Sequence, residues 1–106
     1  MKKVTQEILG RLKASLLRIY GARLQGLYLY GSFARGEERS GSDLDVAMIL
    51  DSYERPWIEI QRTGQIVSDL SLECGMTISL IPLRATDWFG NKKPLVRNIH
   101  REGVAV

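Results

Sequence analysis

Residues 28–50 read YLYGSFARGEERSGSDLDVAMIL, and this stretch decides the fold. It predicts a strand, a turn at Gly31 and Ser32, a charged loop, and a second strand that opens on two aspartates. Asp43 and Asp45 are separated by one residue within a run of strand formers, so both carboxylates leave the same face of the sheet. Two carboxylates placed in this way can hold a metal ion.

The turn before the aspartates suits a phosphate group. Gly31 lets the backbone come close to a bound group, and Ser32 offers a hydroxyl and an N–H. Mg²⁺ prefers oxygen ligands and often shares its shell with substrate phosphates. A phosphate at Ser32 facing a metal at Asp43 and Asp45 is the arrangement that nucleotidyl or phosphoryl transfer needs.

Outward from this stretch, the chain alternates helices and strands. Apolar residues recur at three- and four-residue intervals over residues 5–20, which predicts an amphipathic helix with Thr5 as its N-cap. A strand is predicted over residues 24–30, and a helix over residues 55–74 with Pro56 in its first turn and Gly75 as its stop.

The C-terminal part predicts a third strand over residues 76–81, ended by Pro82. A helical turn at 86–89, a helix at 94–102 and a short strand at 104–106 follow. The order helix, strand, strand, helix, strand, helix predicts an α+β fold, in which a small mixed β-sheet is flanked by helices.

Length and composition narrow the function classes. The 106 residues fit a single domain spanning 1–106, and the lone Cys74 rules out an internal disulfide, which favours a reducing cytoplasm. No apolar run approaches the roughly 20 residues that cross a bilayer, so no membrane partner is expected. The net charge of +3 is spread along the chain, and direct nucleic-acid binding is not expected.

The central stretch resembles the minimal nucleotidyltransferases of the polymerase-beta-like superfamily. Their signature is a glycine-serine turn, about ten further residues and an aspartate-x-aspartate strand. Gly31-Ser32, residues 33–42 and Asp43-Leu44-Asp45 fit it. The resemblance covers most of the chain and implies the polymerase-beta-like nucleotidyltransferase fold.

The resemblance also implies roles for single residues. Gly31 and Ser32 would hold the triphosphate of an NTP, with ATP as the expected substrate, and Arg35 would contact phosphate or the acceptor. Asp43 and Asp45 would be the catalytic residues that coordinate Mg²⁺.

One position departs from the family pattern. The family supplies a third carboxylate from a later strand, where this chain has Ser79. Serine is neither a strong metal ligand nor a base at neutral pH, and loss of a general base costs about 10²–10⁴-fold in rate. Three other acidic residues lie on a predicted helix or loop, and nothing in the sequence indicates that they replace the missing carboxylate: Asp69, Glu73 and Asp87.

Two functions remain open. Small stand-alone members of the family resemble antitoxins that pair with a HEPN-type ribonuclease toxin, and some adenylylate a tyrosine of that partner. By this resemblance the chain would transfer AMP to a hydroxyl of a partner protein. The alternative is a catalytically weak or inactive binding module that neutralises its partner by complex formation, which Ser79 favours. His100, the lone histidine, is expected on an exposed helix face without a catalytic role.

Overall fold

Two antiparallel strands, β1 (Leu24–Tyr30) and β2 (Leu44–Leu50), form the centre of the sheet in the computed structural model, which describes residues 2–106. β3 (Ile78–Arg84) pairs parallel with β2, and β4 (Val104–Ala105) pairs antiparallel with β1. The sheet order is therefore β3-β2-β1-β4. Because a parallel pair needs a long crossover, the chain between β2 and β3 forms a helix.

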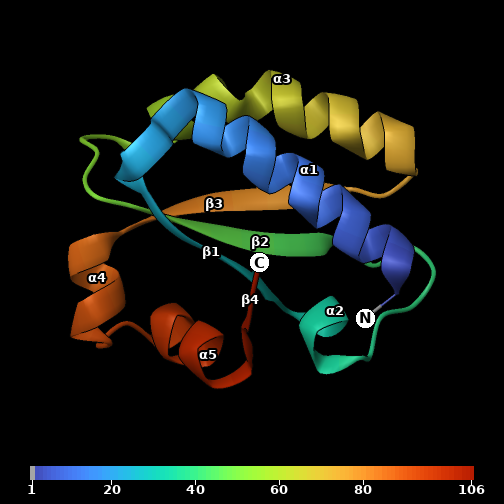
Figure 1. Ribbon diagram of the computed structural model, residues 1–106. Coiled ribbons are helices and arrows are strands. Elements are labelled where there is room, and N and C mark those ends of the chain that lie inside the picture. Colours follow the sequence, from blue (N-terminus) through green and yellow to red (C-terminus); the bar gives the residue numbers. More distant parts are fainter. Residues whose placement is uncertain (1) are drawn as a thin grey trace.

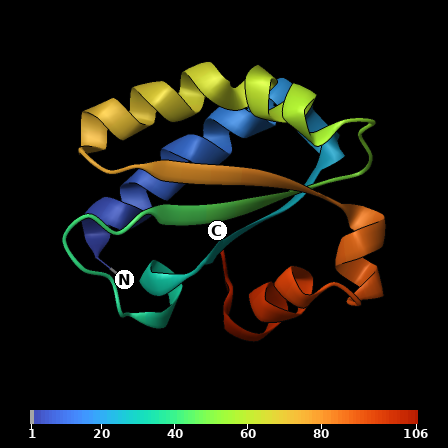
Figure 2. The ribbon, with the colours of Figure 1, turned by 180° about the vertical axis from the view of Figure 1, so that it is seen from behind.

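Helices cover both faces of this sheet (Figures 1 and 2). One face carries α1 (Lys3–Tyr20) and the crossover helix α3 (Pro56–Cys74), which lie side by side. The other face carries α4 (Ala85–Gly90) and α5 (Pro94–Glu102). Two short elements flank β1, a 3-10 turn before it and α2 (Ser32–Arg35) after it. The predicted α+β fold and its mixed sheet are confirmed.

β2 is buried on both faces, which explains its almost unbroken apolar sequence. Val46, Met48 and Leu50 join the core beneath α1 and α3. Ala47 and Ile49 join a second core beneath α4 and α5. Because side chains alternate along a strand, Asp45 points to the same face as Ala47 and Ile49. Asp45 thus lies on the α4 and α5 side, at the end of β2 where the apolar residues stop.

Several predicted boundaries were wrong. β2 begins at Leu44, so Asp43 lies just before the strand, and β3 begins at Ile78, two residues later than predicted. Thr5 is not an N-cap, because α1 already begins at Lys3 and the Thr5 side chain is 2% exposed within the helix. β3 does not end before Pro82, which lies inside the strand opposite Met48. Proline is tolerated there because β3 is an outer strand of the described sheet, where the loss of one backbone hydrogen-bond donor costs little stability.

An aromatic stack fastens α4 and α5 to the sheet. The Trp88 ring lies between Tyr28 of β1 and His100 of α5, with centroid distances of 4.5 and 3.7 Å. His100 Nε2 lies 2.9 Å from the carbonyl oxygen of Trp88. The ring of His100 therefore packs on the core while the residue stays exposed, as predicted.

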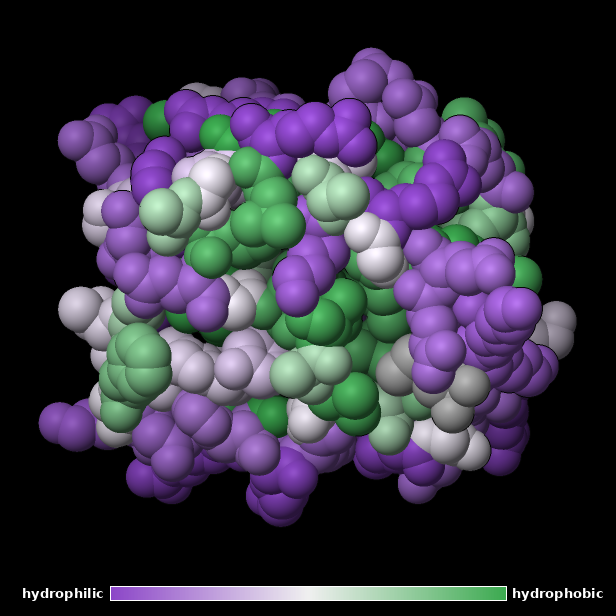
Figure 3. Space-filling model, viewed as in Figure 1, coloured by the Kyte–Doolittle hydropathy of each residue, from purple (hydrophilic) through white to green (hydrophobic). Residues whose placement is uncertain are grey.

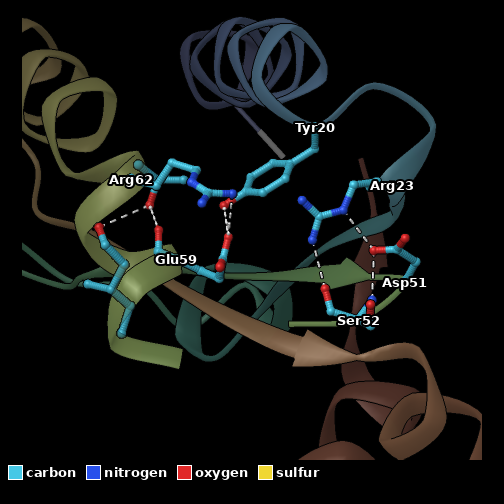
Figure 4. Close-up of polar contacts among 8 residues, drawn as sticks. Tyr20, Arg23, Asp51, Ser52, Glu59 and Arg62 are labelled. Carbon is cyan, nitrogen blue, oxygen red and sulfur yellow. Dashed lines mark hydrogen bonds and ion pairs between the residues drawn. The ribbon is translucent and has the colours of Figure 1, made fainter. Parts of the chain in front are cut away.

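Polar contacts hold the chain at the C-terminal end of β2 (Figure 4). Arg23 Nε donates to Asp51 Oδ1 at 3.0 Å, and the backbone N–H of Ser52 donates to the same oxygen at 2.7 Å. On the neighbouring helix α3, buried Glu59 accepts a hydrogen bond from Tyr20 Oη at 2.9 Å. Burial, followed by this hydrogen bond, raises the pKa of Tyr20 to about 12. Tyr20 therefore stays neutral and joins α1 to α3.

The C-terminal strand is held from two sides. Val106 N–H donates to the carbonyl oxygen of Leu27, and Lys13 Nζ of α1 donates to the carbonyl oxygen of Val106.

Figure 3 shows the surface of the molecule from the side seen in Figure 1. Hydrophobic residues gather across the middle of this surface, with hydrophilic residues along its upper and lower rims. Within residues 2–106, no helix combines the length and apolar character that a membrane span requires.

Candidate functional site

The turn after β1 is shaped around Asp45. Gly31 adopts φ 74° and ψ −157°, a region that side chains other than hydrogen rarely allow. A Cβ at Gly31 would collide with the carboxylate of Asp45. Glycine is therefore required here twice, for its backbone angles and for the space it leaves. The Gly31-Ser32 turn and Asp45 meet at one edge of the sheet.

The two aspartates lie at the start of β2. Asp43 is exposed just before the strand, and Asp45 is half-buried opposite Tyr30 of β1. Burial raises the pKa of Asp45, and the negative charge of Asp43 raises it further, while Arg35 opposes the shift. Burial also raises the pKa of Tyr30, with a further contribution from Asp45. A half-buried carboxylate whose negative form is disfavoured in this way is stabilised by a bound cation.

The third strand places Ser79 directly opposite Asp45. The residue beside Asp45 on the neighbouring strand is therefore a serine, which offers no carboxylate. The other acids considered from the sequence are engaged elsewhere: Asp69 with Gln65, Glu73 with Arg11, and Asp87 with Lys93. Across residues 2–106, no three acidic, histidine or cysteine side chains gather closely enough to hold a metal.

Glu102 is the site residue that sequence reasoning missed. It ends α5, and its Oε1 accepts a hydrogen bond from the Gly31 N–H at 3.2 Å. Its two carboxylate oxygens lie 3.3 and 3.2 Å from Arg35 Nη1. The pairing of β4 with β1 explains this position, since the register Leu29 to Val104, continued by two residues, brings Glu102 to Gly31.

The guanidinium group of Arg35 lies at the site and pairs with two carboxylates there. Besides Glu102, it binds Glu37, whose Oε2 lies 3.2 Å from Arg35 Nε. Hydrogen bonds to Glu37 and Glu102 raise the pKa of Arg35. Arg35 therefore pairs with two carboxylates, and its positive charge also reaches Asp45.

The profile described as "Polymerase beta, Nucleotidyltransferase" matches residues 15–106, which include the turn, both aspartates, Ser79 and Glu102. The chain belongs to this nucleotidyltransferase family. The family and fold predicted from the Gly31 to Asp45 stretch are thereby confirmed. The individual roles of Gly31, Ser32, Arg35, Asp43 and Asp45 remain predictions.

Solved structures show the same fold. A toxin-antitoxin with AMP-PNP matches with a TM-score of 0.62 and 19% identity, covering 89% of this nucleotidyltransferase chain and 68% of that one. A mutant of the toxin-antitoxin MntA-HpeT matches at 0.60 and 21%, with the same coverages of 89% and 68%. A proposed nucleotidyltransferase from Sulfolobus solfataricus matches at 0.60 and 17%, covering 97% of this chain and 76% of that one. The curated proteins contain no match.

Proposed function

We propose that the chain is a Mg²⁺-dependent nucleotidyltransferase that transfers AMP from ATP to a hydroxyl of a partner protein in the cytoplasm. One observation carries the proposal: the Gly31-Ser32 turn is packed against Asp45, with no room for a side chain between them. Nucleotidyl transfer needs a phosphate-binding turn and metal-binding carboxylates next to each other. The family membership of the chain agrees with this chemistry.

The residues fit a metal and a nucleotide. Asp45 lies half-buried near Arg35, which two other carboxylates engage, and Asp43 lies exposed two residues before it. Mg²⁺ at these aspartates would neutralise charge on the phosphates. The Gly31 N–H already faces a carboxylate, that of Glu102, and Ser32 contributes the hydroxyl and N–H that follow it.

The reaction forms a bond from the acceptor oxygen to the α-phosphorus of ATP and breaks the bond to pyrophosphate, which leaves. The acceptor hydroxyl loses its proton. In this chain the neighbour of Asp45 on β3 is Ser79, which does not accept a proton at neutral pH. We propose that water takes up the proton instead. We therefore expect slow turnover, because a missing general base costs about 10²–10⁴-fold in rate.

The partner class rests on the similar structures. Two of them are described as toxin-antitoxin, and one of these contains AMP-PNP, an ATP analogue. We propose that this chain is likewise an antitoxin, and that its acceptor is a HEPN-type ribonuclease toxin. The acceptor hydroxyl would then come from a tyrosine of the second protein.

Ser79 favours a second candidate, a binding module that neutralises its partner through complex formation without chemistry. The reduced carboxylate set next to Asp45 is the observation behind it. The retained turn argues the other way, because simple binding does not require a glycine pressed against a carboxylate.

One experiment separates the two candidates. The chain is incubated with Mg²⁺, ATP labelled on its α-phosphate and the candidate toxin, beside an Asp43→Asn/Asp45→Asn double variant. Asp51→Asn serves as the control for loss of an aspartate charge, because it removes one such charge from the opposite end of β2. Label on the toxin with the unaltered chain and the control, but not with the double variant, supports the enzyme. A neutralised toxin that carries no label supports the binding module.

A further inference from the structure

Glu102 occupies groups that an anionic ligand would use. The Gly31 N–H and the Arg35 guanidinium both point at its carboxylate. These are two of the groups assigned above to the phosphates of ATP. The structure therefore holds an internal anion where a phosphate is expected.

Glu102 is partly withdrawn from water, which makes the contact a defined one. Its side chain is 20% exposed, compared with 65% for Glu37, the other carboxylate on Arg35. Its backbone is fixed as well, because Gly103 N–H bonds to the Ile99 carbonyl at 2.7 Å and a Cβ on Gly103 would collide with that oxygen. The end of α5 is thus locked with Glu102 facing the turn.

The charge of Glu102 is unfavourable in two ways. A carboxylate at the C-terminal end of a helix faces the negative pole of the helix dipole. Glu102 also adds a negative charge at the Gly31 turn, which packs against Asp45. Arg35 and the Gly31 N–H offset this cost only while they bind Glu102, so a more highly charged anion with its metal would compete for them effectively.

We propose that Glu102 is an internal stand-in for a nucleotide phosphate, which the triphosphate displaces from Gly31 and Arg35 when it binds. This inference rests on the proposed nucleotide site and adds its regulation. Because the backbone at Glu102 and Gly103 is fixed, displacement requires only a rotation of the Glu102 side chain.

The test measures Mg²⁺·ATP and inorganic tripolyphosphate affinity by calorimetry for the unaltered chain and for Glu102→Gln. Glutamine keeps the size and the acceptor for the Gly31 N–H but removes the charge. Removing one charge a few ångströms from the phosphates predicts binding about 3- to 10-fold tighter for both ligands. Glu37→Gln is the matched control, with a smaller gain because Glu37 is more exposed and does not reach Gly31.

Arg35→Gln tests the route of the effect. If Glu102 acts by occupying Arg35, Glu102→Gln in the Arg35→Gln background gains less than it does alone. Equal or weaker binding by a folded Glu102→Gln variant overturns the proposal, because it would mean that Glu102 only supports the turn.

A measurement on the unaltered chain covers the case in which Glu102→Gln does not fold. Nuclear magnetic resonance follows the side-chain carboxylate carbon of Glu102 while tripolyphosphate and Mg²⁺ are added. Loss of the Arg35 pairing predicts a shift of this carbon toward the value of an exposed glutamate. An unchanged Glu102 signal at saturating ligand contradicts displacement.

The outcomes separate this proposal from the proposed function. Tighter ATP binding by Glu102→Gln without transfer of label to a toxin leaves the stand-in intact and removes the enzyme. Transfer of label with unchanged affinity in Glu102→Gln does the reverse. If neither the unaltered chain nor Glu102→Gln binds ATP, both proposals fail.

Discussion

The two ends of strand β2 both carry aspartate, but in opposite environments. At the C-terminal end, Asp51 accepts hydrogen bonds from Arg23 and from the Ser52 N–H. These hydrogen bonds lower the pKa of Asp51, with the backbone bond from Ser52 contributing most (Figure 4). At the N-terminal end, burial and Asp43 raise the pKa of Asp45.

The opposite pKa shifts of Asp51 and Asp45 indicate different roles for the two ends of β2. A carboxylate with its own arginine and backbone donor supports the folded state and needs nothing else. A half-buried carboxylate beside a second one costs stability until a cation arrives. Asp51 therefore supports the fold, whereas Asp43 and Asp45 remain the predicted ligand site.

The largest expected effect separates the two ends by activity. Asp43→Asn or Asp45→Asn should lower AMP transfer by at least about 10³-fold, since metal-assisted charge stabilisation contributes several kcal/mol. Asp51→Asn should retain transfer within about 3-fold of the unaltered chain. Transfer rates and Mn²⁺ binding followed by electron paramagnetic resonance measure both. Loss of metal binding in Asp51→Asn would contradict the assignment.

A carboxylate added to the ligand end should sharpen the contrast. Ser79→Asp places a third carboxylate opposite Asp45 and should raise transfer about 10²-fold if the missing base limits the rate. The same variant should lower the Tm of the metal-free chain, because it adds repulsion. Ser79→Asn is the control of equal size without charge. A Ser79→Asp variant that binds metal normally yet gains no rate would show that the base is not limiting.

The glycine that makes room for Asp45 should be costlier to replace than a glycine in open space. Gly31→Ala meets both an unfavourable φ and the Asp45 carboxylate, and should lose about 2–4 kcal/mol of unfolding free energy. Gly36→Ala shares the positive φ of 71° but nothing lies within 4 Å, so it should lose only about 1 kcal/mol. Urea denaturation compares them, and equal losses would remove the argument from close approach.

The smallest effect concerns pH and has opposite signs at the two ends. Asp45 binds its proton more tightly in the folded chain, so its ionisation costs stability as pH rises above 3.8 and through its raised pKa. Asp45→Asn should therefore raise the Tm of the metal-free chain at pH 7 by less than about 5 °C. This gain should vanish as pH falls below 3.8.

For Asp51 the direction is reversed. Its pKa is lowered by folding, so its contribution is complete above 3.8 and is lost as pH falls through the lowered value. Asp51→Asn should lower the Tm at pH 7 by less than about 5 °C, and the deficit should close in acid. Thermal unfolding across pH measures both variants, and shifts of equal sign would contradict the contrast between the two ends.

Local patterns were enough to predict β2, the Gly31 turn and their meeting. The alternation that starts at Asp43 predicts which side chains share a face. The Gly31-Ser32 pair predicts the turn without information from the rest of the chain. Pro82 was read as a strand end because sequence does not say which strand lies at the edge. The local pattern at Thr5 predicts a cap, because its burial by other parts of the chain leaves no mark on that pattern.

Glu102 could not be placed from sequence for a different reason. Its position depends on the register of a two-residue strand with a partner more than 70 residues away, and no local pattern sets that register. The sequence predicts the short strand and the stop at Gly103, but it does not predict which residue faces Gly31. A cross-strand register is a tertiary property, and here it decides which carboxylate faces Gly31.

Both outer strands of the described sheet are poor templates for adding another strand. β3 carries Pro82 near its middle, where one donor is missing, and β4 is only two residues long. Exposed, regular strand edges promote pairing between molecules, and proline and short strands suppress it. Pro82, which lies within β3 and does not end it, thus also protects the chain against edge-to-edge aggregation.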